Sequence, residues 1–376
     1  MISAQLREAT LEVDLAALRH NLRTQLKQIP GAQVLAVVKA NAYGNGLIPV
    51  ATCLNSEPGI AGFCVAMLDE GRQLRDVGIE KTVLVLGITP VKYAPVAAAE
   101  GVSLAVGDLD WLRAYRDLAR VTGIDKPLRV HLALDTGMGR IGFTNKEDLA
   151  KAVELVQDPA FDFEGIFTHF STADSGRQHD TAHFAKQVAK WDDLLSVVKE
   201  KPRYVHVANS ATALWHQDKV VSKIVRMGIS LYGCNPSGSE LAPSWQLAPV
   251  TSLTARLTFV KKLAAGEAVS YGATYVAKED EWVGTVPVGY ADGYCRGLTG
   301  YEVLINGQRC PILGRICMDQ FMVRLPEKLP VGTRVVLLGK SGDEQITATD
   351  LADQLGTINY EVLTNFNERL RREYRG

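Results

Sequence analysis

Apolar residues in the first 235 positions gather into short runs, and several of these runs are rich in Val and Ile. Short runs with few polar positions are typical of parallel strands that are buried on both faces. Eight such runs lie at 34–38, 63–66, 83–87, 102–106, 128–134, 163–170, 204–208 and 224–228. The pattern therefore predicts eight parallel strands.

Amphipathic stretches with helical spacing separate the runs. The stretch at 108–118 can be capped at its N-terminus by Asp108 or Asp110. A further helix is expected at 15–26, before the first strand, with Asp14 as its cap. Strands that alternate with helices eight times predict a TIM barrel. An open doubly wound sheet is the alternative, but no GxGxxG motif follows the first run.

The pattern changes after about residue 236, where NPSGSELAPSWQLAP has the Pro and Ser content of a linker. Beyond it, turns rather than helices separate the strand-like runs, which indicates a mainly β region. These runs lie at 253–260, 283–288, 301–305, 321–325 and 334–338, and one helix is expected at 348–370. We therefore expect an α/β chain with a (β/α)8 barrel at 1–240 and a mainly β domain at 241–376.

Composition narrows the choice of function. The chain has 41 Lys and Arg against 42 Asp and Glu, and this balance argues against broad, non-specific nucleic-acid binding. No stretch of 18 apolar residues predicts a membrane span, and the N-terminus does not resemble a signal peptide. The six cysteines show no CxxC spacing, so we expect free thiols in the cytoplasm and no zinc site.

Functional residues of a TIM barrel follow the C-terminal ends of its strands. Lys39 follows the first run; desolvation there would lower its pKa and free the amine for Schiff-base chemistry, unless the ammonium reaches solvent. Arg140 follows the fifth run and can meet an anion or phenolate, or form a surface ion pair. His169 lies in the sixth run, where a buried histidine bonded to a carbonyl is the ordinary outcome.

The seventh and eighth runs end in small and polar residues. Asn209 and Ser210 follow the seventh, while the eighth carries Arg226 and Gly228, with Ile229 next. TIM barrels commonly bind phosphate at these two strand ends. Ser210 offers a hydroxyl, and Gly228 lets backbone amides come close to a ligand. A lysine at the first strand and a phosphate site here together predict pyridoxal phosphate (PLP) bound to the lysine.

Nine motifs in chain order resemble those of the alanine racemase family: VVKANAYGNG, LDTGMGRIGF, THFSTAD, VANSAT, VRMGISLYG, SYG, PVGYADGY, GRICMDQ and TINYE. The resemblance covers nearly the whole chain. It implies a PLP-dependent isomerase that interconverts L- and D-alanine and supplies D-alanine for peptidoglycan. It also implies a head-to-tail homodimer with shared active sites.

The resemblance assigns roles by position. Lys39 would bind the cofactor and act as one base, and Tyr271 would be the opposing base, acting in the site of the other subunit. Arg226, supported by His169, would bond the pyridine nitrogen, and Arg140 would lie near the cofactor's phenolic oxygen and the substrate carboxylate. The remaining cofactor-binding positions are Tyr43, Asn209, Ser210, Gly228, Ile229 and Tyr360. Those that reach the substrate are Met318 and Asp319, and those that line the access channel are Tyr290, Arg296, Arg315 and Ile358.

One position departs clearly from the family pattern. Many members carry a carbamylated lysine two residues before the aspartate of DTGMGR, and this sequence has Ala133 there. The carbamate orients the arginine that corresponds to Arg140 with a fixed negative charge, which alanine cannot supply. We therefore expect an anion such as chloride near Arg140, or another means of holding that side chain. A smaller departure is Ser171, where the family often has alanine.

Other functions fit these residues less well. A racemase that acts on serine as well as alanine is the nearest alternative. A barrel decarboxylase for basic amino acids would need an acidic residue in the place of Arg226. A non-catalytic PLP-binding protein would usually consist of the barrel alone, and a regulatory or scaffold barrel would not bind PLP.

Overall fold

The computed structural model describes residues 5–123, 125–220 and 222–376. Its N-terminal region holds eight parallel strands in the order β8-β7-β6-β5-β4-β3-β2-β9. Their bounds are β2 (Gln33–Val37), β3 (Ile60–Val65), β4 (Thr82–Val85), β5 (Ser103–Val106), β6 (Leu128–Ala133), β7 (Phe161–Phe167), β8 (Tyr204–His206) and β9 (Ile224–Met227). A parallel bridge between Ala208 and Val225 closes the ring of strands. Each strand overlaps one of the eight predicted runs, so the barrel is confirmed.

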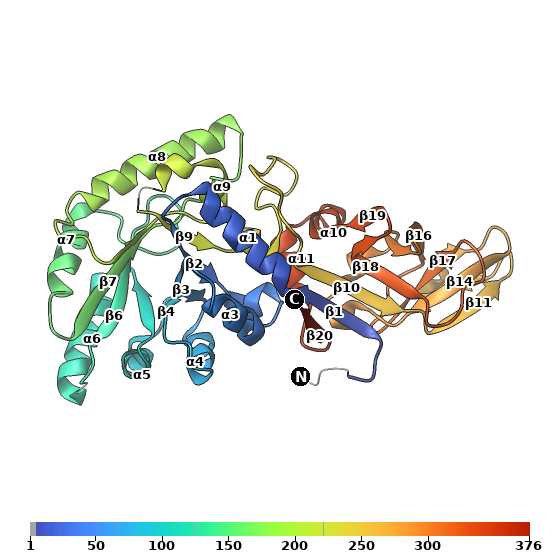
Figure 1. Ribbon diagram of the computed structural model, residues 1–376, viewed down its shortest axis with the longest axis horizontal. Coiled ribbons are helices and arrows are strands. Elements are labelled where there is room, and N and C mark those ends of the chain that lie inside the picture. Colours follow the sequence, from blue (N-terminus) through green and yellow to red (C-terminus); the bar gives the residue numbers. More distant parts are fainter. Residues whose placement is uncertain (1–4, 124, 221) are drawn as a thin grey trace.

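Helices cover the outside of the barrel (Figure 1). They are α1 (Leu15–Gln28), α3 (Leu47–Asn55), α4 (Leu68–Asp76), α5 (Ala94–Glu100), α6 (Leu109–Thr122), α7 (Lys146–Leu155), α8 (Gln178–Leu195) and α9 (Ser210–Trp215). The carboxylate of Asp14 caps α1 by accepting a hydrogen bond from the Ala17 amide at 2.8 Å. Asp108, rather than Asp110, caps α6 by accepting from the Trp111 amide at 2.8 Å. In the described ranges, no helix is long and apolar enough to cross a bilayer.

The C-terminal region is built on a second, mostly antiparallel sheet (Figure 1). Its strands follow the order β11-β14-β17-β16-β15-β18-β10-β1-β20, with β19 paired to β18. Their bounds are β1 (Ala9–Asp14), β10 (Thr251–Arg256), β11 (Phe259–Leu263), β14 (Glu281–Val286), β15 (Glu302–Ile305), β16 (Gln308–Leu313), β17 (Phe321–Leu325), β18 (Arg334–Ser341), β19 (Glu344–Ile346) and β20 (Arg371–Arg375). The mainly β character predicted for this region is confirmed.

Two expected elements are divided in the structure. The run at 253–260 forms two strands, because the chain changes partners after Leu257: β10 pairs with β18, and β11 pairs with β14. The helix expected at 348–370 is also wrong as a single element. Gly356, with a φ of +67°, ends α10 (Ala348–Leu355), and a separate helix, α11 (Asn359–Asn365), follows.

The N-terminal strand β1 lies in the second sheet although it precedes the whole barrel in sequence. It pairs antiparallel with β10 and parallel with β20, so both ends of the chain join the sheet of the C-terminal region. The division at 240/241 therefore remains a prediction for the rest of the chain, while the segment 9–14 belongs by its pairing to the β region. The first barrel helix starts directly after β1, which links the two regions.

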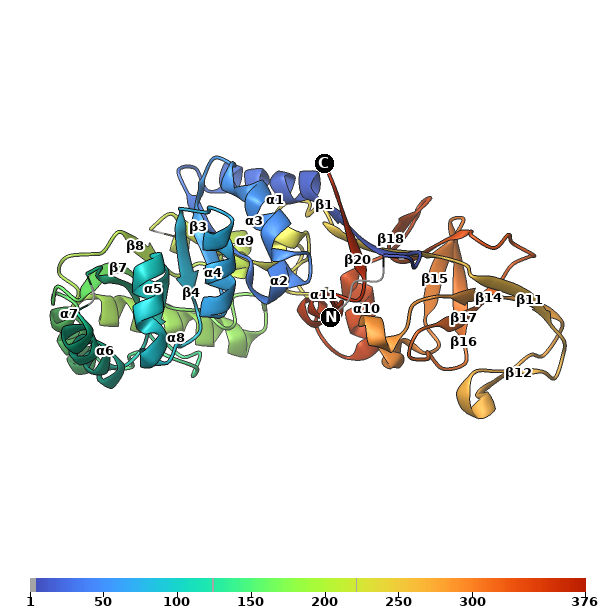
Figure 2. The same cartoon turned by 90° about the horizontal axis from the view of Figure 1, so that it is seen from below.

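Two small elements decide where functional side chains lie. Helix α11 packs next to the barrel, between it and the second sheet (Figure 2). The two-stranded hairpin of β12 (Ala268–Val269) and β13 (Tyr275–Val276) lies on the side of the second sheet away from the barrel of the same chain (Figure 2). The first element can thus contribute to the barrel mouth, and the second cannot.

Candidate active site

A cavity of about 680 Å³ opens at the C-terminal ends of the barrel strands. Its volume is in the range of small-molecule sites. Among the residues that line it are eleven of the predicted site residues: Lys39, Tyr43, Arg140, His169, Asn209, Ser210, Arg226, Gly228, Ile229, Ile358 and Tyr360. The barrel therefore brings together residues that are far apart in sequence.

Lys39 opens a short segment, α2 (Lys39–Tyr43), whose backbone is left-handed. The four residues 40–43 have φ values of +53° to +54°, a conformation that costs L-residues roughly 1–2 kcal/mol each. The carboxylate of Glu70 holds its start by accepting hydrogen bonds from the amides of Ala40 and Ala66, both at 2.7 Å. This turn lets Lys39 and Tyr43 both face the cavity. Sequence reasoning missed Glu70, whose only signal was its place in the first turn of a helix.

Lys39 is desolvated, as the sequence predicts for a lysine at this position. Burial lowers the pKa of its amine, and the positive charge of Arg140 lowers it further. Arg140 forms no ion pair or hydrogen bond with any residue in the described ranges. Arg226 adds a second guanidinium group to the lining of the cavity. The cavity is therefore suited to a ligand with several negative charges.

Arg226 is 3% exposed and is held by the barrel itself. Its Nη1 donates to Nδ1 of His206 at 2.8 Å and to the carbonyl of the same residue at 2.9 Å. Its Nη2 donates to the carbonyls of Thr168 at 2.7 Å and Val207 at 3.3 Å. Nε has no hydrogen-bond partner within the described chain, which leaves it as the donor for a ligand in the cavity.

His169 lies beside this arginine, with its Nδ1 at 3.4 Å from Nη2 of Arg226. Burial and the charges of Arg226 and Arg140 lower the pKa of His169 to about 3. Burial also lowers the pKa of Arg226, to about 10, so that the guanidinium remains a cation at neutral pH. The pair thus consists of a charged arginine and a neutral histidine.

Hydroxyl groups gather in the part of the cavity next to Gly228. Oγ of Ser210 accepts hydrogen bonds from the amides of Gly228 at 3.0 Å and Ser230 at 3.4 Å, and no described residue accepts its own proton. Burial raises the pKa values of Tyr43 and Tyr360, so both phenols stay protonated and can donate. A Cβ atom at Gly228 would lie 2.7 Å from the hydroxyl of Tyr43, which explains the glycine.

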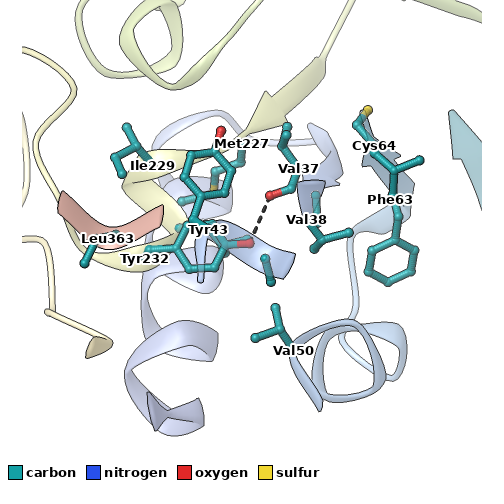
Figure 3. Packing of buried hydrophobic residues seen from close by; sticks show 14 of the residues in the cluster. Val37, Val38, Tyr43, Val50, Phe63, Cys64, Met227, Ile229, Tyr232 and Leu363 are labelled. Atoms are coloured by element: carbon teal, nitrogen blue, oxygen red, sulfur yellow. Dashed lines mark hydrogen bonds between the residues drawn. The ribbon is translucent and has the colours of Figure 1, made fainter. Parts of the chain in front are cut away.

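The ring of Tyr43 packs on Tyr232, with 4.8 Å between ring centroids. Figure 3 shows these two rings together, with the hydroxyl of Tyr232 donating to the carbonyl of Val37 at 3.0 Å.

Asn209 has a different role from the neighbouring Ser210. Its Oδ1 accepts from the Thr212 amide at 2.9 Å and caps α9, and its Nδ2 donates to the Phe170 carbonyl at 3.0 Å.

The predicted residues of the C-terminal region form a separate group, the β-domain cluster. It consists of Tyr271, Tyr290, Arg315, Met318 and Asp319, and none of the five lines the barrel cavity in the described chain. Hydrogen bonds join their loops: the Tyr290 amide donates to the Cys317 carbonyl at 3.1 Å, and Oγ of Ser270 donates to the Arg315 carbonyl at 2.6 Å.

The β-domain cluster is open to solvent. Tyr271 is 68% exposed and Met318 is 53% exposed. Asp319 forms an ion pair with Arg369, and Arg296 begins a one-turn helix (Arg296–Leu298) close in sequence to the loop of Tyr290. The structure therefore brings the predicted residues together as two groups, of which only the first forms a cavity.

Ala133 is buried against apolar neighbours. It packs with Ala105 and Phe167, and the half-buried Leu86 and Ile141 complete this small cluster. Within the described residues, no acidic side chain forms an ion pair or hydrogen bond with Arg140. What holds Arg140 in place of the carbamate therefore stays a prediction.

A barrel whose first strand ends in a desolvated lysine amine, in a cavity that is also lined by hydroxyl groups, resembles the class of barrel enzymes that bind pyridoxal phosphate. Comparison with known families is more specific. Residues 13–236 match the N-terminal domain of alanine racemase and residues 250–374 match its C-terminal domain. The chain belongs to the alanine racemase family, whose members are PLP-dependent isomerases.

Individual relatives agree with this assignment. The chain is 60% identical to an alanine racemase of Limosilactobacillus fermentum and 52% identical to one of Lactiplantibacillus plantarum, over 98% or more of each chain. Among solved structures, an alanine racemase from E. faecalis has a TM-score of 0.95 at 47% identity, with both chains fully covered. A histidine racemase from Leuconostoc mesenteroides has a TM-score of 0.92 at 35% identity, also with full coverage.

Proposed function

We propose that this chain interconverts L-alanine and D-alanine, with pyridoxal phosphate held in the barrel cavity. The observation that carries the proposal is the desolvated amine of Lys39, which lines the same cavity as Arg140 and Arg226. A neutral amine can attack a carbonyl carbon and can also accept a proton, and both are needed here. The product D-alanine would serve peptidoglycan synthesis, and the six free thiols support a place in the reducing cytoplasm.

The residues of the cavity fit this cofactor. Lys39 supplies the amine, the unpaired Nε of Arg226 supplies a donor for the ring nitrogen, and the hydroxyl proton of Ser210 is free for a phosphate oxygen. The protonated phenols of Tyr43 and Tyr360 add two donors at the same end. When bound, the cofactor supplies electron withdrawal that acidifies the α-proton of the amino acid.

Racemisation requires a proton to leave one face of Cα and another to return on the opposite face. Lys39 serves one face, since its pKa is lowered toward the range in which an amine can accept a proton. Tyr271 is the proposed base of the other face, but it lies in the β-domain cluster and does not reach the cavity of its own chain. A second copy of the chain must therefore supply it, which requires a head-to-tail homodimer.

Exposure supports this arrangement. Tyr271, Met318 and Tyr290 are large apolar side chains with exposed fractions of 68%, 53% and 42%. Ile358, at the mouth of the barrel cavity, is also 60% exposed. Side chains of this kind are enriched where proteins meet. In the proposed dimer, Met318 and Asp319 reach the substrate, and Tyr290, Arg296, Arg315 and Ile358 line the access channel.

Arg226 would also limit side reactions. A guanidinium does not release its proton near neutral pH, so Arg226 donates a hydrogen bond at Nε without transferring the proton. The electron withdrawal from Cα is then weaker than it would be beside an acid that protonates the ring. Return of the proton to Cα is thereby favoured over transamination.

A small anion such as chloride is proposed next to Arg140. This arginine has no acidic partner in the described ranges, and Ala133 leaves only apolar atoms where the family often carries a carbamate. An anion would neutralise part of the charge of Arg140 and fix its direction. The side chain could then bind the substrate carboxylate and the cofactor's phenolic oxygen.

Alanine is the expected substrate and serine a second candidate. The aromatic side chains Tyr43 and Tyr360 line the cavity, and Tyr271 and Tyr290 of a second copy would narrow it further. A pocket of this kind discriminates one added group by only about 1–3 kcal/mol. The structural likeness to a histidine racemase makes the substrate range worth measuring with larger amino acids as well.

The proposal is tested by incubating the purified protein and pyridoxal phosphate with L-alanine and measuring both enantiomers by chiral chromatography. We expect approach to equal amounts of the two enantiomers. Lys39→Ala should abolish this, while Lys151→Ala, which removes an exposed lysine paired with Glu147, should not. Absence of D-alanine from the wild-type reaction would contradict the proposal.

A further inference from the structure

A continuous chain of hydrogen bonds crosses the interior of the barrel below the candidate site. Nη1 of Arg226 contacts Nδ1 of His206 at 2.8 Å, and Nε2 of His206 contacts Nδ1 of His131 at 2.9 Å. Nε2 of His131 then contacts Oε2 of Glu164 at 3.0 Å. The side chains of His206 and His131 are fully buried, and that of Glu164 is 6% exposed. Nothing in the proposed reaction uses the lower two members.

The positions of the protons in this chain follow from its two ends. A guanidinium can only donate, so Nδ1 of His206 must be bare and its proton must lie on Nε2. That proton requires a bare Nδ1 on His131, whose own proton must then lie on Nε2. The ionised carboxylate of Glu164, which can only accept, completes the series. All donors therefore point in one direction, from Arg226 toward Glu164.

Glu164 is well placed to stay ionised at the lower end. Oγ of Ser103 donates to Oε2 and Oγ1 of Thr82 donates to Oε1, the latter at 3.3 Å. Burial raises the pKa of this carboxyl, and the hydrogen bonds that it accepts from His131 and Ser103 oppose that rise. Glu164 also lines a second cavity, of about 330 Å³, together with Thr82, which starts β4, so this end of the chain lies near the N-terminal ends of the strands.

We propose that Glu164 is a positioning residue for Arg226, which acts through His131 and His206. Its acceptor oxygens fix the tautomers of both rings, and the second ring then presents a bare nitrogen to the guanidinium. With Nη1 and Nη2 held in this way, Nε is the donor of Arg226 that no described residue engages, and Arg226 lines the cavity. This inference rests on the proposed function in one respect: that function is what gives Arg226 a ligand to bind.

Removal of the acceptor has a definite consequence. Without Glu164, the proton on Nε2 of His131 would be buried with no partner, which is costly in a dry interior. Reversal of both tautomers would relieve that, but it would place an N–H of His206 against the Nη1 protons of Arg226. The guanidinium would then have to move, and Nε would lose its direction.

Two substitutions of Glu164 distinguish the effect of its acceptor oxygens from the effect of its negative charge. Glu164→Gln keeps an acceptor oxygen for His131, and its amide group can donate to Thr82, so the tautomers should be retained. Glu164→Leu keeps much of the volume and removes both acceptors. Glu57→Gln and Glu57→Leu are matched controls, because Glu57 is 7% exposed and is bound by Arg23 at 2.8 Å on the outside of the barrel.

The first measurement is nitrogen-15 NMR of the full-length protein with labelled histidine, which distinguishes protonated from bare ring nitrogens. In the wild type, we expect the protons of His131 and His206 on Nε2. A proton on Nδ1 of either ring would overturn the proposal, whether or not any variant folds. This readout does not depend on racemase activity, so its failure is distinguishable from failure of the proposed function.

The second measurement is the ratio of pyruvate to inverted alanine, with kcat, KM and the urea midpoint of each variant. By analogy with the outer partners of metal-ligating histidines, we expect Glu164→Leu to lower kcat by about 10- to 100-fold, and to raise the share of pyruvate. Glu164→Gln should stay close to the wild type in this ratio. Equal ratios in Glu164→Leu and Glu57→Leu, at similar urea midpoints, would show a purely structural role and overturn the proposal.

Discussion

The barrel cavity and the β-domain cluster differ in how their side chains are supported. Tyr43 and Arg226 in the cavity are 7% and 3% exposed, and hydrogen bonds and aromatic packing from their own barrel hold them. Tyr271 and Met318 are 68% and 53% exposed and lie on loops that are joined mainly to each other. The first group is preorganised by the chain that carries it, whereas the second is largely open to solvent in that chain, as the proposed dimer requires.

The strongest test of this difference is an experiment that divides the two proposed bases between two chains. Lys39→Ala and Tyr271→Phe should each lose about 10²- to 10⁴-fold in kcat, the contribution of a positioned base. After unfolding and joint refolding of equal amounts, we expect about one quarter of the wild-type activity, because half of the dimers are mixed and one of their two sites is intact. Activity is measured by chiral analysis of alanine.

The mixture also has an internal control. Separately refolded variants that are combined only after dimers have formed should stay inactive until the subunits exchange. If the jointly refolded mixture were no more active than the single variants, Lys39 and Tyr271 would have to act within one chain. The exposed position of Tyr271 would then need another explanation.

Arg226→Glu tests the barrel cavity, whose side chains are preorganised by their own chain. A carboxylic acid at this position can share a proton with the ring nitrogen, which a guanidinium does not do. We expect kcat for racemisation to fall by about 10²-fold, as for other preorganised charged donors. The share of pyruvate among the products and a long-wavelength absorbance band in the presence of alanine should both increase. An unchanged spectrum and product ratio would contradict the role given to Arg226.

The same difference between the two regions explains what could be predicted from sequence. Each barrel strand is buried on both faces, as the fully buried Val83, Leu84 and Val85 show, so its apolar run is visible without any knowledge of neighbours. Residues at the strand ends, such as Lys39, could then be placed by the geometry of the barrel alone. These predictions depend only on local sequence and on a known closed architecture.

Features that depend on distant partners were missed. Strand β1 joins the second sheet only because β10 and β20, more than 230 residues later, provide its partners. Glu70 and Glu164 act on backbone and ring nitrogens of other elements, and no local pattern reveals such contacts. A charged residue inside the apolar run at 163–170 was nevertheless a signal, since buried carboxylates are rarely unpaired.

Acid should destabilise the two regions unequally. All seven histidines precede residue 241. Burial lowers the pKa of His169 to about 3, and it lowers that of His206 as well. An unfolded histidine binds a proton below about pH 6.5, whereas these two stay neutral when folded, so the unfolded state gains protons and stability falls as the pH drops from 7.

Between pH 7 and pH 5, each of these two histidines should lower the free energy of unfolding by about 2 kcal/mol. Urea unfolding at the two pH values measures the sum of the two contributions to the free energy of unfolding. Hydrogen exchange should locate this loss of stability in the barrel rather than in the β region. His169→Gln removes one titrating group and should reduce the difference by about half. An equal pH dependence in this variant would show that another group is responsible.

The smallest expected effect concerns Arg140, a residue of the barrel cavity that the barrel does not supply with a partner of opposite charge. Arg140 has no acidic partner in the described chain, and Ala133 packs against Ala105 and Phe167 where a charge would be needed. Chloride should therefore raise kcat/KM by about fivefold when it replaces gluconate at constant ionic strength, which corresponds to about 1 kcal/mol, the upper range for an exposed ion pair. Constant ionic strength removes general screening as the cause. Activity that is indifferent to halide, together with a crystal structure in bromide without an ion beside Arg140, would mean that the barrel holds this arginine without help. The cavity would then be complete apart from what the second subunit supplies.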